Sequence, residues 1–271
     1  MMFALRFLPV LFCLFLILGV PSTAAKAQTY VLQAHPVFTA EQSAAVFQPL
    51  ADYLSESTGY RFELQTPRDF HRHWLDIRRG GLPDLVVEDA HLIALRMNRY
   101  GYEPLVRAEQ PATFSLMTTL PGTDLKLADF IARPVTTLPA PSLGHLVLAS
   151  WYPNPMQQPR IQSTARSWLD AVESVFSMEA DAAIVPHNLV SRYVNMTEVV
   201  VSTEFPHLSV AASPRLDKEV REAVRRALLE LHEDPDQFGV LHELDIERFV
   251  IASGDEYLGL ENWLDWVYSD F

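Results

Sequence analysis

Five of the nine histidines in this sequence follow segments whose composition predicts a β-strand. They are His35, His91, His145, His187 and His207, which end the segments YVLQAH, DLVVEDAH, PVTTLPAPSLGH, DAAIVPH and TEFPH. In an open α/β sheet, the loops after the carboxyl ends of the strands converge on the crevice where ligands bind. Neutral imidazole coordinates divalent transition metals, so this placement predicts a ligand site with metal binding as one of its chemistries.

A metal site would combine residues from both halves of the chain. The four candidate metal ligands are His35, His91, His145 and His187. Closure of the two halves would bring these imidazoles onto one ion, with Glu88 or Asp89 as an accompanying carboxylate. No cofactor is required on this interpretation, and a divalent transition metal is the one candidate for a bound ion.

Other interpretations of the same residues stay open. An oxyanion or a small organic acid is an equally suitable ligand, and His207, directly after Pro206, is expected to be a polar surface residue at a hinge. A cleft hydrolase would pair Ser142 with His145, but the Gly-x-Ser-x-Gly elbow is missing. The residues predicted to bind a ligand are His35, Glu88, Asp89, His91, Ser142, Gly144, His145 and His187.

The elements that must position these residues alternate between strand and helix. The first half predicts strands over 30–34, 61–65 and 84–88, and helices over 40–57, 69–80 and 90–100. Thr39 and Gln42 form a capping box before the first helix, and Gly59 follows its end. Such alternation favours parallel strands joined by crossover helices.

The alternation restarts after a turn at Pro121 and Gly122. The second half predicts strands over 135–138, 160–164 and 182–185, and helices over 127–131, 142–151, 168–176 and 188–194. Tail helices are expected over 217–230, 234–244 and 259–268, the last packing onto the first half.

Two extended stretches, 112–118 and 201–211, are expected to cross between the halves. The predicted fold class is therefore α/β, a two-lobed clamshell with a two-strand hinge. Lobe 1 would comprise residues 28–115 and 206–271, and lobe 2 residues 116–205. The ligand would lie in the cleft between the lobes, where hinge closure buries it.

The first 27 residues predict a cleavable signal peptide, so the protein is expected in the periplasm. Arg6 precedes an apolar run over 7–20, and Ala25-Lys26-Ala27 provides the small-x-small cleavage pattern. The one cysteine, Cys13, lies in this segment, which predicts an exported protein without a thiol or disulfide. Cleavage would make the formal net charge of −13 more negative by two, which argues against a nucleic-acid partner.

Several short motifs occur in a recognisable order along the chain. They are FQPLADYL (47–54), TGY (58–60), DF (69–70), Gly81, DL (84–85), PSLG (141–144), DAA (181–183), SPRL (213–216), DP (234–235) and EY (256–257). In this pattern the sequence resembles the periplasmic substrate-binding proteins of phosphate, phosphite and phosphonate ABC importers. The resemblance implies a type II periplasmic-binding fold and a non-enzymatic monomer. It also implies that a small molecule or ion is delivered to an ABC permease or a membrane sensor.

The resemblance also implies where an anion would bind. In that family a turn rich in serine and threonine opens a helix of the second lobe and holds the oxyanion. Here the corresponding stretch, 140–145, keeps one hydroxyl, Ser142, and Pro141 has no N–H to donate. Glu88 and Asp89 stand where the family has aromatic and hydroxyl residues, and their carboxylates would repel a phosphonate. The sequence therefore leaves a cation and an anion as alternative ligands.

Overall fold

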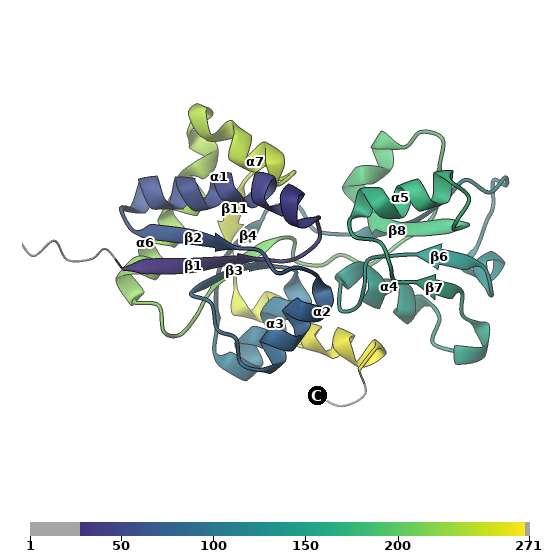
Figure 1. Cartoon of the computed structure of the whole chain (residues 1–271), viewed down its shortest axis with the longest axis horizontal. Coiled ribbons are helices and arrows are strands. Elements are labelled where there is room, and N and C mark those ends of the chain that lie inside the picture. Colours follow the sequence, from purple (N-terminus) through teal and green to yellow (C-terminus); the bar gives the residue numbers. More distant parts are fainter. Residues whose placement is uncertain (1–27, 269–271) are drawn as a thin grey trace, which may run out of the picture.

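The computed structural model describes residues 28–268, which form two α/β lobes built on separate sheets (Figure 1). The predicted signal peptide, with Cys13, lies outside the described residues. Within residues 28–268, every helix is too short or too polar to cross a bilayer.

The sheet of the first lobe has six strands in the order β11-β4-β10-β3-β1-β2. These strands are β1 (Thr29–Ala34), β2 (Arg61–Gln65), β3 (Leu85–Glu88), β4 (Glu103–Ala108), β10 (Ser209–Ala212) and β11 (Phe249–Ile251). One face carries α1 (Ala40–Thr58), α6 (Lys218–Glu230) and α7 (Phe238–Glu243), and the other carries α2 (Phe70–Arg78) and α3 (Ala90–Tyr100) (Figure 1). Helices thus cover both faces, which buries the apolar strands between them.

The ends of α1 follow from its local sequence, as predicted. The Thr39 side chain accepts from the backbone N–H of Gln42, and the Gln42 side chain accepts from the backbone N–H of Thr39. Gly59 ends the helix with a φ of 74°, a conformation that is sterically easy only for glycine. This helix packs its apolar side against β1 and β2 in the core of the first lobe.

The sheet of the second lobe has five strands in the order β7-β6-β8-β5-β9. These strands are β5 (Phe114–Thr118), β6 (Pro134–Thr136), β7 (Arg160–Gln162), β8 (Ala182–Pro186) and β9 (Thr197–Val201). Helices α4 (Leu143–Trp151) and α5 (Trp168–Phe176) lie on opposite faces of this sheet (Figure 1). The core of the second lobe is a separate apolar cluster, which also takes in Val37 and Phe70 of the first lobe.

Two chain segments connect the lobes, one from β4 to β5 and one from β9 to β10. They run side by side, because Ala112 and Phe205 exchange two backbone hydrogen bonds of 2.9 Å. The predicted hinge strands were too long. Residues 114–118 are already β5 of the second sheet and residues 209–212 are β10 of the first, so the connections are shorter than expected.

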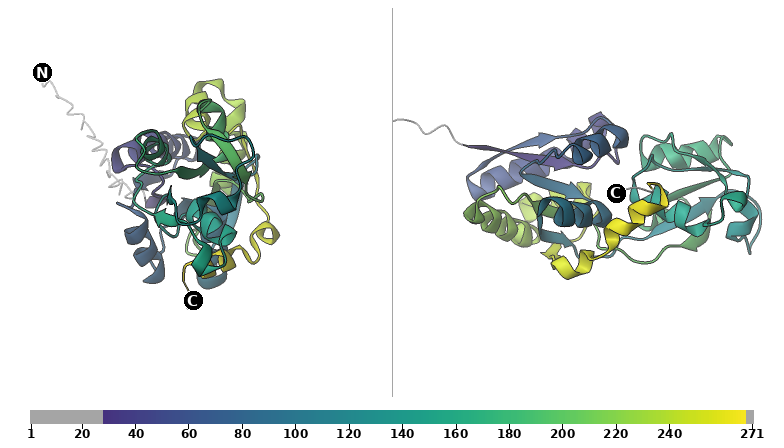
Figure 2. Two further views of the ribbon diagram at one scale, coloured as in Figure 1. Left: turned by 90° about the vertical axis from the view of Figure 1, so that its right-hand side faces the viewer. Right: turned by 90° about the horizontal axis from the view of Figure 1, so that it is seen from below.

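The carboxyl-terminal part of the described chain contacts both lobes. It forms the 3₁₀ helix η7 (Leu260–Trp266), which packs on α3 of the first lobe and on α4 of the second. Trp263 makes an edge-on contact with Phe205 at the hinge, with ring centroids 4.9 Å apart. Figure 2 shows this yellow segment running from the first lobe toward the second. The prediction that it packs on the first lobe alone was incomplete.

Sheet pairing differs from the all-parallel expectation. Strands β4 and β11 were not predicted, and β10 lies antiparallel between β3 and β4. Proline is unusual inside a sheet because it has no N–H to donate, so Pro104 argues against a strand at this position. The strand accommodates it at an irregularity, since Val210 pairs with Val106 and the next residue, Ala211, pairs with Pro104. The segments expected to be helical over 127–131, 188–194 and 259–268 contain 3₁₀ helices.

Candidate functional site

Three of the predicted site residues gather where β1 and β3 end, at the edge of the first sheet that faces the second lobe. His35 follows β1, and its backbone N–H donates to the carbonyl of Val87 at 3.0 Å. Asp89 follows β3 at the N-cap of α3, and His91 lies in the first turn of that helix. Parallel pairing of β1 with β3 is what brings these distant residues together, as predicted.

Glu88 lies beneath this edge and has no free oxygen for a ligand. Arg96 donates to both carboxylate oxygens, Nε to Oε2 at 2.6 Å and a terminal nitrogen to Oε1 at 2.7 Å. His73 Nε2 lies 2.8 Å from Oε1, and all three side chains are fully buried. The prediction that Glu88 binds the ligand therefore conflicts with its contacts, because both carboxylate oxygens are engaged by Arg96 and His73 inside the lobe.

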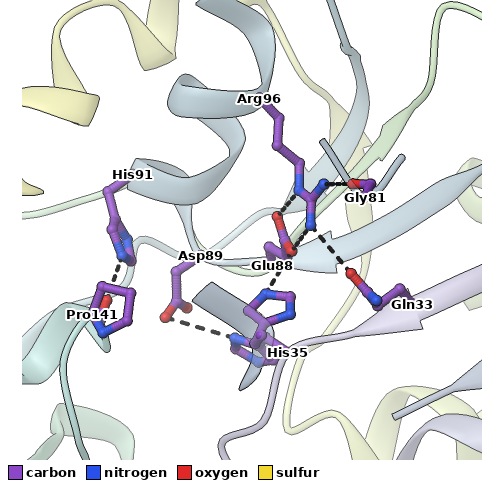
Figure 3. Close-up of polar contacts among 9 residues, drawn as sticks. Gln33, His35, Gly81, Glu88, Asp89, His91, Arg96 and Pro141 are labelled. Carbon is purple, nitrogen blue, oxygen red and sulfur yellow. Dashed lines mark hydrogen bonds and ion pairs between the residues drawn. The ribbon is translucent and has the colours of Figure 1, made fainter. Parts of the chain in front are cut away.

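The same network sets the charge of Glu88. Burial opposes ionisation, but Arg96 and His73 outweigh burial and hold the pKa of Glu88 far below its ordinary value. Arg96 is fixed further by its bonds to the side chain of Gln33 at 3.2 Å and the carbonyl of Gly81 at 3.3 Å (Figure 3). The network thus ties β1, β3, α2 and α3 together directly behind Asp89.

Asp89, unlike Glu88, has its carboxylate at the edge of the first sheet that faces the second lobe. Its carboxylate makes no capping bond to the helix, and its Oδ2 lies 3.7 Å from Nδ1 of His35. Figure 3 shows Asp89 between His35 and His91. Burial favours the neutral acid, but His35, His91 and His207 outweigh burial and lower the pKa of Asp89. His207 therefore belongs to this cluster, whereas the sequence had suggested a surface residue at the hinge.

His91 makes a direct polar contact between the lobes. Its Nε2 lies 2.7 Å from the carbonyl oxygen of Pro141 in the second lobe (Figure 3). A carbonyl only accepts, so Nε2 carries the hydrogen and donates it. The other ring nitrogen, Nδ1, is buried and has no hydrogen-bond partner. Burial lowers the pKa of His91, which favours the neutral ring with a bare lone pair on Nδ1.

The turn of the second lobe that the resemblance assigned to an anion is occupied by its own contacts. The Ser142 hydroxyl donates to the carbonyl of Leu138 at 3.2 Å and accepts from the backbone N–H of His145 at 3.3 Å. The Ala140–Pro141 peptide bond is cis. The one hydroxyl of this turn therefore caps α4 instead of standing free for an oxyanion.

Gly144 has a packing role at its position in α4. A Cβ at this residue would lie 2.8 Å from the indole ring of Trp168 and 3.3 Å from the ring of Phe114. Such close approach means that only glycine lets these aromatic side chains lie against the helix. The contacts of Gly144 are therefore with the core of the second lobe.

His145 and His187 do not join the cluster around Asp89. His145 Nδ1 pairs with the hydroxyl of Ser163 at 3.1 Å. His187 Nδ1 lies 2.8 Å from the Ser115 hydroxyl and 2.9 Å from the carboxylate of Glu198. Among residues 28–268, no three histidine or carboxylate side chains are arranged to hold a metal ion. The predicted four-histidine metal centre is therefore not assembled.

The contacts of Ser142 and His145 do not support the hydrolase alternative. Ser142 Oγ is engaged by Leu138 and by the backbone of His145, and the ring nitrogen Nδ1 of His145 pairs with Ser163. The Ser142 hydroxyl thus gives its hydrogen to a backbone carbonyl and not to the imidazole that would have to act as its base.

Sequence reasoning missed Arg96 and the carbonyl of Pro141, and it named His207 but set it aside as a surface residue. Arg96 had a usable signal, because a lone arginine in the apolar run AHLIALR of α3 requires a buried partner. The position of His207 and the Pro141 carbonyl depend on how the two lobes meet, for which the local sequence carries no signal.

Comparison with known proteins agrees with this architecture. Residues 32–257 match the family described as ABC transporter, phosphonate, periplasmic substrate-binding protein. No curated protein sequence matches the chain.

Solved structures with the same fold include two from phosphonate systems. One is PhnD1 from Prochlorococcus marinus in complex with methylphosphonate, with 13% identity and a TM-score of 0.74 over 88% of this chain and 97% of that one. Another is a binding-protein component of a phosphonate ABC transporter from Pseudomonas aeruginosa, with 14% identity and a TM-score of 0.72 over 88% and 85% of the two chains.

A Xanthomonas citri protein bound to ATP is similar over 88% of this chain and 97% of its own, with 16% identity and a TM-score of 0.70. At these identities the structures establish the type II periplasmic-binding fold alone. The family match covers most of the sequence. The chain therefore belongs to the periplasmic phosphonate-type substrate-binding proteins of ABC transporters, which are binding proteins and not enzymes.

Proposed function

We propose that this protein captures a small solute between its lobes and presents it to an ABC permease or a membrane sensor of the phosphonate type. The observation that carries the proposal is the pair of short hinge segments, bonded at Ala112 and Phe205, with the His91–Pro141 contact on the closing side. Two lobes joined in this way open and close by hinge rotation. Such closure is how a binding protein signals to its partner that it is loaded.

The remaining features of the proposal come from the sequence. Residues 1–27 would be removed as a signal peptide on export to the periplasm. Lobe 1 would comprise residues 28–115 and 206–271 and lobe 2 residues 116–205. The mature protein would act as a monomer and need no cofactor.

We place the solute at the lobe junction, defined by His35, Asp89, His91 and His207 on one side and the Pro141–Ser142 turn on the other. A transition-metal ion is the second candidate for this place. It is favoured by the buried Nδ1 atoms of His35 and His91, which lack hydrogen-bond partners beside a carboxylate. Without three ligands in position, a metal would have to draw these side chains together.

Titration calorimetry tests the function and the place of binding together. The panel comprises methylphosphonate, inorganic phosphate, ethylamine, Cu²⁺ and Zn²⁺. We expect one of these probes to bind with one-to-one stoichiometry and without turnover. His91→Ala should weaken that binding at least about tenfold, because His91 joins the two lobes at the junction.

His187→Ala is the matched control, since its ring is half exposed and paired with Ser115 and Glu198 inside the second lobe. It should leave the affinity unchanged. Equal loss of affinity in both variants, or saturable binding that His91→Ala does not weaken, would place the solute elsewhere. Turnover of a probe would refute the binding function itself.

A further inference from the structure

A second polar contact joins the two lobes at Asp245, which follows α7. Its Oδ2 accepts from the side-chain nitrogen of Asn188 at 2.5 Å and from a terminal nitrogen of Arg192 at 3.1 Å. Both partners lie on the 3₁₀ helix η3 (His187–Arg192) of the second lobe. Helix α7 covers the face of the first sheet opposite α3, which carries His91 (Figure 1). Asp245 and His91 therefore contact the second lobe from opposite sides of the first sheet.

Each end of the Asp245 contact is anchored in the core of its own lobe. Leu244 and Ile246, on either side of Asp245, are buried in the core of the first lobe. Leu189 and Val190 of η3 are partly buried against the core of the second lobe. A rotation of one lobe away from the other would therefore separate the carboxylate from its partners, because each segment moves with its own lobe.

The backbone at Asp245 has a conformation that favours glycine. Its φ is 55°, in the left-handed region. The N–H of Asp245 donates to the carbonyl of His242 at 3.1 Å, and the N–H of Ile246 donates to the carbonyl of Leu241 at 3.1 Å. These two bonds form a Schellman motif, in which glycine is the usual residue at the left-handed position. The chain thus has a carboxylate where the local backbone alone would favour glycine.

The Asp245 contact lies near the proposed place of the solute and is open to water. Burial lowers the pKa of His207, and the charges of Asp89 and Asp245 oppose that effect, so Asp245 is close to the polar cluster at the junction. The side chains of Arg192 and Asp245 are 58% and 44% exposed. Salt therefore reaches and screens this ion pair, unlike the buried pair of Glu88 and Arg96.

We propose that Asp245, with Asn188 and Arg192, is a latch that holds the lobes closed and so raises the affinity for a solute that it does not touch. The inference rests on the proposed solute-binding function, because closure is the step that the latch stabilises. The apparent affinity for a solute falls with the fraction of protein in the closed form. An exposed ion pair of this kind changes such an equilibrium by about two- to fivefold.

The latch can be tested without any solute, by measuring the distance between the lobes. Residues 28–271 contain no cysteine, so Glu56→Cys on α1 and Glu173→Cys on α5 place one spin label at an exposed position on each lobe of the exported protein. Double electron–electron resonance then gives the populations at short and long distances. We expect Asp245→Gly and Arg192→Met each to raise the ratio of the long to the short population by about two- to fivefold.

Salt and a double variant test whether these residues act together. About 0.5 M NaCl should shift the unmodified protein toward long distances and should shift either latch variant much less, because the ion pair is already absent. Adding Arg192→Met to Asp245→Gly should produce little further change, as expected for two residues that act through one contact.

Measurements of stability separate the latch from the fold. Asp245→Gly should not lower the unfolding temperature, because glycine is the residue best suited to a φ of 55°. Met178→Gly is the matched control, since Met178 is an exposed residue of the second lobe with a φ of 61°. It should likewise keep the unfolding temperature, and it should leave the distances between the labels unchanged.

Three outcomes would overturn the inference. These are unchanged label distances in Asp245→Gly and Arg192→Met, effects that add in full in the double variant, and a salt response of the double variant as large as that of the unmodified protein. A probe that calorimetry shows to bind should bind about two- to fivefold more weakly to Asp245→Gly. Failure of every probe to bind would count against the solute-binding function, and the label distances would still decide whether the latch exists.

Discussion

Replacing Arg96 by methionine should lower the free energy of unfolding by about 3–5 kcal/mol, because it leaves a buried carboxylate without its partner. Methionine fills much of the same space, so lost packing contributes little. Arg96 and Glu88 are both fully buried, and Glu88 has no solvent to replace the two bonds it would lose. Chemical denaturation followed by circular dichroism measures the change.

The matched control for this prediction is Arg99→Met, one turn further along α3. Arg99 is exposed, so its replacement should change the free energy of unfolding by less than about 1 kcal/mol. The double variant Arg96→Met with Glu88→Gln should recover part of the loss, because no charge is then buried alone. Equal stability of Arg96→Met and Arg99→Met would contradict the assignment of the network.

The second large effect is expected at Leu146, which joins the lobes through apolar contacts. Leu146 lies on α4 of the second lobe but packs in a cluster with residues of the first lobe and the carboxyl-terminal segment. That cluster contains Trp74, Ile77, Leu92, Leu95, Leu146 and Leu264. Leu146→Ala should remove about 2–5 kcal/mol from this contact. A loss of this size shifts the equilibrium of the lobes toward the open form.

Leu148→Ala on the same helix is the control for that experiment. Leu148 is equally buried, but it belongs to a different cluster, most of whose members lie in the second lobe. Both variants should lower the free energy of unfolding, and only Leu146→Ala should increase the radius of gyration in small-angle X-ray scattering. An equal radius of gyration for the two variants would show that the Leu146 cluster does not hold the lobes together.

The Arg96 and Leu146 variants would both disturb residues that position the lobe junction. The Glu88–Arg96–His73 network holds the end of β3 and the start of α3, which together present Asp89 and His91 to the junction. The Leu146 cluster and the Trp263–Phe205 contact hold the second lobe against that edge. The position of this edge and the contact between the lobes thus depend on separate sets of buried residues.

Local sequence was sufficient for most of the helices and strands. The capping box at Thr39, the positive-φ Gly59 and the apolar period of α1 are settled within a few residues, and the structure confirms each of them. The α/β alternation and the clamshell also follow from local signals, because each buried strand is short, apolar and flanked by turn residues. Strand β11, of three residues, and strand β4 escaped prediction.

The sequence predicted the site only to the extent that it predicted which strand ends lie together. Parallel pairing places strand ends together, and the structure accordingly brings His35, Asp89 and His91 to the same edge of the sheet. The role of each side chain was not predictable, since Glu88 and Asp89 are neighbours in sequence and differ in fate. The Glu88 side chain points into the lobe toward Arg96, whereas the Asp89 side chain lies between His35 and His91 (Figure 3).

The sequence by itself determined the secondary structure, the family pattern and the edge of the sheet where the polar residues lie. Only the tertiary structure decided which atoms remain free there. Hydrogen bonding and burial depend on partners distant in the chain, such as Pro141 for His91 and Arg96 for Glu88. A histidine at a strand end is a candidate ligand in sequence. The neighbours that the fold brings to it decide whether it binds a solute, joins two lobes or only packs.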